Sequence, residues 1–219
     1  MRIEDHPAEL AHRLDRAFGF TSPDAADTWL ALVRELACGR PVDPAELGTG
    51  ADEIIAGFPG TEWSGGEVEG SIITLHPTTH SITHAGGTAY AWSAFGALLA
   101  GVILDGPVEI RSTCPATGED VTVTVSGGVL LDGRAGIVSL PTRFRGPADI
   151  RGDFAGRALL WSRRPNRAGR AAVVAGTGHW DVAWYRPADA MAVVRETARL
   201  LGLSPWSRED LPELHARIA

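Results

Sequence analysis

The sequence contains no lysine, and all 20 of its basic residues are arginine. Cysteine is also scarce: only Cys38 and Cys114 occur, and neither belongs to a Cys-x-x-Cys or Cys/His cluster. This scarcity excludes a disulfide-rich scaffold and argues against a structural zinc or iron–sulfur centre. We expect no metal and no cofactor. The absence of lysine is typical of a GC-rich bacterial genome and indicates no particular function.

Long apolar segments and an export signal are missing as well. The longest apolar run, residues 89–104, is shorter than a membrane span and is interrupted by Ser93, Gly96 and Gly101. The first residues, MRIEDHPAELAHRLDR, are charged throughout and lack the apolar core of a signal peptide. We therefore expect a cytoplasmic protein with no membrane partner.

The charge is negative overall but unevenly distributed. A net charge of −7 and a pI near 5.5 argue against general binding to nucleic acids. Residues 143–170 nevertheless hold eight arginines against two aspartates, a local charge of +6. This Arg-rich segment fits either an exposed loop or a site for an anionic small molecule, and Arg157 and Arg163 are its candidate binding residues.

The first third of the chain predicts short helices. One is expected over 7–20, and a second begins at Thr21-Ser22-Pro23-Asp24, where a hydroxyl supplies the cap, and ends at Gly39. A third, short helix begins at Asp43-Pro44, and another covers 51–57. Helices followed by residues 62–74 resemble a winged helix, so we predict a winged-helix-like region over 1–65 and an α+β domain over 66–219. We expect no DNA binding, because residues 21–57 hold seven acidic residues against Arg34 and Arg40.

The remainder predicts an α+β fold with a mixed sheet. A stretch that is apolar on all sides, Tyr90–Leu104, predicts a buried helix, and Ala188–Leu201 an amphipathic one, with another helix opening at Ser207. The predicted strands alternate between apolar and polar residues or are bounded by turn residues. They lie at 71–75, 80–84, 107–112, 120–125, 136–140, 157–162, 171–175 and 180–185.

Three motifs resemble the organomercurial (alkylmercury) lyase family. They are Val33-Arg-Glu-Leu-Ala37, Tyr90-Ala-Trp92 before the apolar stretch, and Ser112-Thr-Cys-Pro-Ala-Thr-Gly118. The likeness extends from about residue 25 to 162. It implies an alkylmercury-lyase-like α+β fold, and it raises the expectation of protonolysis of carbon–mercury bonds.

The residues that would carry this chemistry are absent. In the family, as the resemblance implies, a cysteine follows the Tyr-Ala-Trp, an aspartate comes three residues later, and a second cysteine follows a later Phe. Here these positions are Ser93, Gly96 and a position near Ala155. A hydroxyl cannot replace a thiolate on a soft metal such as mercury. The resemblance therefore predicts an inherited fold whose reaction has been lost.

The family's pocket would remain, with Tyr90, Trp92 and Gly96 as candidate binding residues and Ser93 as a candidate nucleophile that needs a base. The alternative for Ser93 is a hydroxyl bonded to its own helix. Gly96 in place of an acid is expected to open space for a ligand.

Histidines supply the candidate bases. His76, His80 and His84 recur every four residues, so in a strand they share one side; we single out His80 for binding and His84 for catalysis. In a strand, Asp181 could also orient His179 as a general base. For all of them, an exposed structural role is the alternative.

Three functional hypotheses follow. The first is a repurposed enzyme acting on a small, anionic metabolite in the pocket around Trp92, Ser93 and Gly96. The alternative is a non-catalytic protein that binds or senses a small molecule or a metal. The third is residual organomercurial lyase activity.

Overall fold

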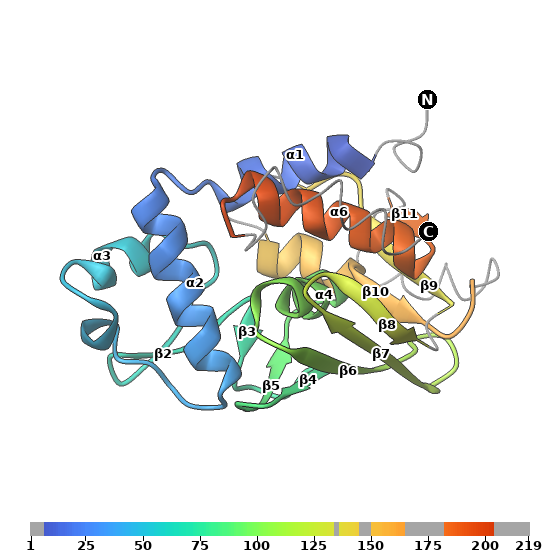
Figure 1. Cartoon of the computed structure of the whole chain (residues 1–219), viewed down its shortest axis with the longest axis horizontal. Helices are drawn as coiled ribbons and strands as arrows, with labels where there is room; N and C mark the ends of the chain where they lie inside the picture. Colours follow the sequence, from blue (N-terminus) through green and yellow to red (C-terminus); the bar gives the residue numbers. More distant parts are fainter. Residues whose placement is uncertain (1–6, 134–135, 145–149, 165–181, 204–219) are drawn as a thin grey trace.

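Two antiparallel sheets and their covering helices make up the computed structural model, which describes residues 7–133, 136–144, 150–164 and 182–203 (Figure 1). The helical elements before the sheets are α1 (Pro7–Phe18), α2 (Pro23–Ala37), the 3₁₀ turn η2 (Pro44–Leu47) and α3 (Ala51–Ala56). Helix α2 begins as its sequence predicts: Ser22 Oγ accepts a hydrogen bond from the amide of Ala25 (3.1 Å), and Pro23 occupies the first turn.

The larger sheet has eight strands in the order β1-β2-β3-β5-β4-β6-β7-β8. The strands are β1 (Glu62–Ser64), β2 (Glu67–Ser71), β3 (Ile73–Thr74), β4 (His80–His84), β5 (Gly87–Ala91), β6 (Pro107–Thr113), β7 (Asp120–Ser126) and β8 (Val129–Gly133). Every strand pair in the described ranges is antiparallel, where a mixed sheet was expected. Alternation is clear in β7, whose apolar residues are buried and whose polar ones face outward.

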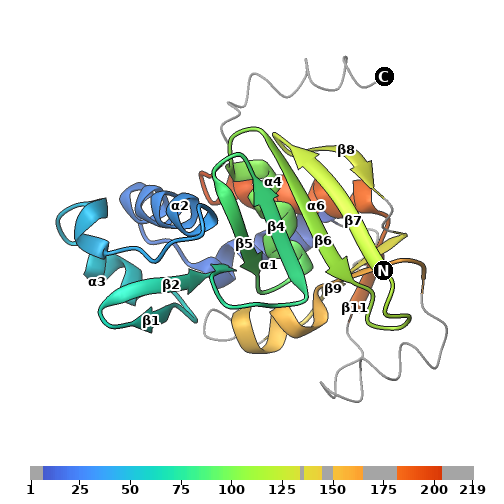
Figure 2. The same ribbon diagram turned by 90° about the horizontal axis from the view of Figure 1, so that it is seen from below.

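One helix lies against the inner face of this sheet (Figure 2). This is α4 (Ala94–Ile103), and each of its ten residues is buried, as its uniformly apolar sequence predicts. The predicted start at Tyr90 is wrong, because Tyr90 and Ala91 pair with β3 and β4 as the end of β5. Strand pairing captures these two residues, and the helix begins only after the cap at Ser93.

A smaller sheet and a last amphipathic helix cover the other side of α4. The sheet has the order β10-β9-β11, and its strands are β9 (Ile137–Pro141), β10 (Leu159–Trp161) and β11 (Val182–Tyr185). The helical turns η4 (Ile150–Phe154) and η5 (Ala155–Arg157) lie between β9 and β10 in the chain, and helix α6 (Pro187–Leu200) follows β11. Helix α6 packs on both α4 and α1, and Figure 1 shows α1 and α6 side by side. The predicted strand 171–175 and the helix opening at Ser207 lie outside the described residues.

The structure does not confirm the winged-helix prediction. The β1–β2 hairpin, which would be the wing, is one end of the eight-stranded sheet, and α2 packs on β2, β3 and β5. One hydrophobic core includes residues from both sides of the predicted boundary at 65/66, which falls in the turn of this hairpin. The division of the chain into two regions remains a prediction.

The contact between α4 and the sheet depends on Gly101. A Cβ atom at this position would overlap the side chain of Val125 on β7. We expect Gly101→Ala to destabilise the protein by about 2 kcal/mol, because overpacking outweighs the gain of about 1 kcal/mol in helix propensity. Urea unfolding measures this, with Gly156→Ala as control, since a Cβ at Gly156 would contact nothing. Equal midpoints for the two variants would contradict close packing here.

Candidate functional site

Three segments meet where α4 begins. Ser93 is the N-cap of α4: its Oγ accepts a hydrogen bond from the amide of Gly96 at 3.1 Å, and the residue is buried. The amide of Trp92 donates to the carbonyl of Ile72 (3.0 Å), and that of Ala94 to the carbonyl of Ala158 (2.7 Å). The Ser93 hydroxyl therefore caps the helix. This is the structural role that was the alternative to a nucleophile.

Ile72 fills the space beside Gly96. A Cβ atom at Gly96 would lie 2.8 Å from Cγ1 of Ile72 and 3.3 Å from its carbonyl oxygen. The expectation that Gly96 opens a pocket is therefore wrong. Ile72 also has a φ of 65°, a conformation that is costly for a β-branched residue, and it is the only described non-glycine residue with a positive φ. Such strain is held in place by the surrounding packing.

An aromatic hollow lies next to Ile72 and Trp92. Its remaining lining residues are Phe18, Phe20, Trp29, Phe58, Pro59, Ser71 and Ile150. The volume is about 10 Å³, enough for one water at most. The one hydroxyl in the wall, on Ser71, accepts a hydrogen bond from Nε1 of Trp29 (3.0 Å). The hollow therefore offers apolar and aromatic surface and little polarity.

A buried carboxylate that the sequence did not single out, Glu62, bonds to Trp92, one of the residues that line the hollow. Glu62 Oε1 accepts a hydrogen bond from Nε1 of Trp92 (3.2 Å) and pairs with Arg151, and its Oε2 accepts one from Oγ1 of Thr74. The Glu62 side chain is 7% exposed, whereas that of Arg151 is 51% exposed. The Arg151 guanidinium also lies over the Trp92 ring, 5.2 Å from its centroid. Arg151 thus joins Glu62 to Trp92.

Comparison with known proteins shows the family of this chain. The alkylmercury lyase family model matches residues 73–149. The chain is 32% identical over 164 residues to an alkylmercury lyase of Streptomyces lividans, an alignment that covers 69% of this chain and 76% of that protein. This chain belongs to the alkylmercury lyase family. An alkylmercury lyase of Pseudomonas putida is also 32% identical, over 139 residues, covering 59% of this chain and 65% of the relative.

The fold agrees with this membership. The crystal structure of the mercury-bound form of MerB2 superposes with a TM-score of 0.69 at 18% identity, covering 88% of this chain and 98% of the MerB2 chain. The alkylmercury-lyase-like α+β fold expected from the motifs is confirmed. In this chain, the N-terminus of α4 carries neither a thiol nor a carboxylate, since it has Ser93 at the cap and Gly96 in the first turn.

His80 is buried under α4 and lies outside the hollow. It pairs across the sheet with Ala91 and Ser112, and its Nδ1 lies 2.6 Å from Oγ of Ser112. Burial lowers the pKa of His80 from 6.5 to about 4, so the ring is neutral near pH 7. Its Nε2 is buried and makes no hydrogen bond within the described residues. Binding of a ligand by His80 remains a prediction.

The other two histidines of the motif have separate partners. His84 Nε2 donates to the carbonyl of Ala37 (3.1 Å), and its Nδ1 accepts from the amide of Gly86 (3.2 Å), so both ring nitrogens connect α2 to the β4–β5 turn. His76 Nε2 lies 3.0 Å from the Glu69 carboxylate. The structure therefore shows no shared site for the three side chains, and catalysis by His84 stays a prediction without support from this geometry.

The remaining candidates that the structure describes, Tyr90, Arg157 and Arg163, do not line the hollow. Tyr90 is half-buried in β5, where alternation directs it away from the face of Ala89 and Ala91. Arg157 is buried and donates to the carbonyl of Arg143 (3.0 Å), whereas Arg163 is exposed. His179 and Asp181 lie outside the described residues.

Cys114 is a buried thiol, as expected from its place in the motif. Its burial raises the pKa, but hydrogen bonds with Ser162 and Thr117 lower the value to about 7. Within the described ranges, no group of His, Cys, Asp or Glu stands together as a metal site, and no helix is long and apolar enough to cross a membrane.

Glu62 is the functional candidate that sequence reasoning missed. Nothing in its local sequence marks it as buried. One signal was available: Gly70 stands opposite Glu62 in the β1–β2 hairpin, and a Cβ there would overlap the Glu62 carboxylate. A glycine inside a strand often marks a close approach of this kind.

Proposed function

We propose that this member of the alkylmercury lyase family does not break carbon–mercury bonds, and that it binds a small apolar or aromatic molecule in the hollow beside Trp92. The proposal rests on the residues found at the start of α4, where the resemblance places the family's reacting groups. Ser93 Oγ caps α4, and Ile72 occupies the space at Gly96. No thiolate or acid is present there, so binding is the activity that the site can perform.

The walls of the hollow support a neutral ligand rather than the anionic one expected from the Arg-rich segment. Of its nine lining residues, only Ser71 is polar, apart from the indole N–H groups of Trp29 and Trp92, and all three are engaged in hydrogen bonds. An anion placed there would lose its hydration and could gain at most the O–H of Ser71, because both indole N–H groups already donate to protein acceptors. An aromatic or alkyl group would gain contact with several rings.

A ligand can enter only if the hollow widens, and the contact between Arg151 and Glu62 is where it can open. Ile150 lines the hollow, and Arg151 follows it in a five-residue π-helical turn, a form that is often found at functional sites. Because Arg151 is half-exposed, its pair with Glu62 is only weakly stabilising compared with a buried one. Opening this contact would displace Ile150 and uncover Trp92.

A repurposed enzyme is the second candidate, and Glu62 favours it. A buried carboxylate beside Trp92 is a possible acid–base group, and Arg151 could leave it to hold an anionic substrate. Turnover that Glu62→Gln abolishes would establish this candidate in place of the binding protein.

Thermal shift with indole, toluene, acetate and phosphate tests the proposed function. Binding to the native state raises the melting temperature with concentration. We expect shifts with indole and toluene only, and no release of benzene from phenylmercury in the presence of excess thiol. Benzene release at the rate of a two-cysteine relative would refute the loss of cleavage, and shifts by the anions alone would refute the apolar site.

The Arg151 contact gives a further prediction. If the pair with Glu62 contributes about 1 kcal/mol to the closed state, Arg151→Gln should raise the competent fraction and tighten indole binding about fivefold. Calorimetric titration with indole measures the affinity. Arg111→Gln is the matched control, because Arg111 forms an exposed pair with Glu109 (2.7 Å) away from the hollow. An affinity unchanged in both variants would show that this contact does not control entry.

A further inference from the structure

A groove at the end of the molecule is separate from the aromatic hollow. It lies between the turn containing η2, the helix α3 and the β1–β2 hairpin, and its volume is about 860 Å³. Asp43, Thr49, Asp52, Trp63 and Gly66 are among its lining residues, and none of the residues around it lines the hollow. Figure 1 shows α3 and β2 at the end of the molecule away from α6.

Trp63 gives the groove an exposed aromatic surface. It is 44% exposed, and within the described ranges only Leu131 is another large apolar side chain with such exposure. Trp63 belongs to β1, the first strand of the sheet, and among the described residues no strand pairs with its outer edge. An indole face attracts cations, and an open strand edge can pair with an extended backbone.

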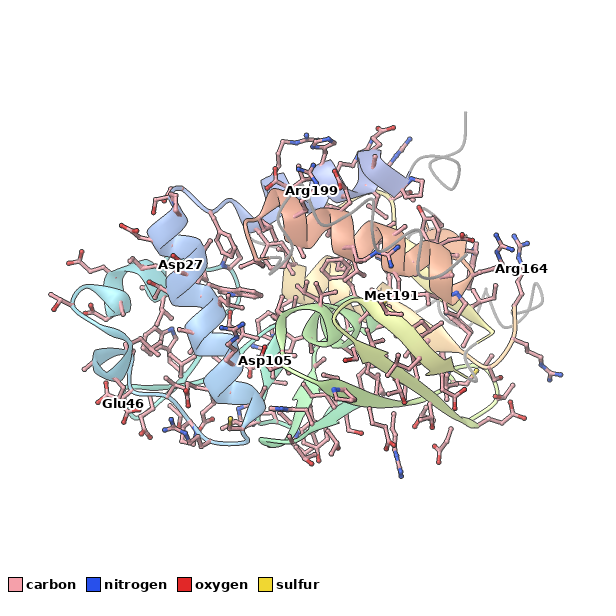
Figure 3. All side chains as sticks on the ribbon, viewed as in Figure 1. Asp27, Glu46, Asp105, Arg164, Met191 and Arg199 are labelled. Carbon is pink, nitrogen blue, oxygen red and sulfur yellow. The ribbon has the colours of Figure 1, made fainter. Side chains whose placement is uncertain are left out.

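The groove's surroundings are acidic. Residues 41–67 contain six carboxylates and no basic residue. Two of the six have an arginine partner in the structure: Glu62 pairs with Arg151, and Glu46 with Arg40 (3.4 Å). Asp43 and Asp52 remain on the groove wall, and Figure 3 places Glu46 at the end of the molecule opposite Arg164. This acidic wall favours a positively charged partner over a negatively charged one.

We propose that this groove is a docking site for an extended, arginine-bearing segment of a partner protein. One guanidinium lies on the face of Trp63, and the carboxylates of Asp43 and Asp52 hold it and its neighbours. The groove has a volume of about 860 Å³, and β1 offers backbone groups along its outer edge. The proposal stands independently of the hollow, because the two sites share no residue.

Fluorescence anisotropy with a fluorescein-labelled Gly-Arg-Gly-Arg-Gly-Arg peptide tests the site at low salt. Its twin with citrulline in place of arginine keeps the shape and removes the charge. We expect the citrulline peptide to bind at least about tenfold more weakly, Trp63→Ala to weaken the arginine peptide about tenfold, and Asp52→Asn about threefold. Trp63 and Asp52 are both exposed, and an unchanged melting temperature shows that each variant is folded.

Two controls distinguish a built site from general attraction. Asp105→Asn removes an exposed acid outside the groove, and Leu131→Ala removes the other exposed apolar side chain. Binding in both should stay within about twofold of the original protein. Equal weakening by Asp105→Asn and Asp52→Asn, or full binding by Trp63→Ala, would overturn the proposal. Self-association that Asp52→Asn abolishes would assign the groove to a second copy and overturn it as well.

Discussion

Acidification from pH 7 to pH 4 should cost the folded state roughly 3 kcal/mol through His80 alone. Burial lowers the pKa of this histidine from 6.5 to about 4, so the unfolded chain binds a proton between these values while the folded chain does not. Stability from His80 is therefore complete above pH 6.5 and declines as the pH falls toward 4. When His80 is protonated, its ring becomes positively charged and its buried Nε2 bears an N–H group. Within the described residues Nε2 makes no hydrogen bond, so nothing there stabilises the charged ring.

Urea unfolding at a series of pH values measures this contribution. His80→Gln removes the titrating ring, so its loss of stability between pH 7 and 4 should be smaller by the same roughly 3 kcal/mol. The other ionisable groups remain in both proteins and largely cancel in the difference. His12→Gln is the control, because His12 is exposed on α1. An identical pH profile for His80→Gln and the original chain would show that His80 titrates normally.

Restoring the family's reacting groups should restore carbon–mercury cleavage only when Ile72 is changed as well. The restoring substitutions are Ser93→Cys, Gly96→Asp and Ala155→Cys. With Ile72 in place, an aspartate at position 96 has no room, because its Cβ would lie 2.8 Å from Ile72 Cγ1. Ile72→Gly frees this space and suits the φ of 65°. We expect the quadruple variant, with all four substitutions, to release benzene from phenylmercury at a rate at least about 100-fold above background.

Gas chromatography of benzene in the presence of excess thiol measures this release. The matched control replaces Gly96 by Asn in the same quadruple background, which keeps the size of the side chain and removes the acid. It should bind mercury through the two thiols without releasing benzene. If the triple variant with Ile72 intact is as active as the quadruple variant, Ile72 does not obstruct the site.

Local signals in the sequence were sufficient for the helices and for the family. Ser22, Pro23 and Gly39 act within a few residues, and they place both ends of α2. The apolar stretch Tyr90–Leu104 predicted a fully buried helix, and α4 is buried throughout, although it begins later than predicted. The motifs around Tyr90 and Ser112 led to the alkylmercury lyase family, whereas the exchange of its reacting groups stays a prediction from the resemblance.

The contents of the site could not be predicted in the same way, because they depend on contacts between distant residues. Ile72 reaches Gly96 from another segment of the chain, and Glu62 reaches Trp92 from the edge of the sheet. The spacing of four between the histidines predicted that they share one side of a strand. In the structure, strand register places His80 beside Ser112, and His84 bonds instead to the carbonyl of Ala37. Neither choice is encoded in spacing.

The packing of α1 against α6 has a consequence for synthesis on the ribosome. Helix α1 carries the buried residues Leu10 and Leu14, and α6, against which it packs, is translated long afterwards. Until α6 is translated, the apolar side of α1 lacks this partner, so the layer that the two helices form can be completed only late in synthesis.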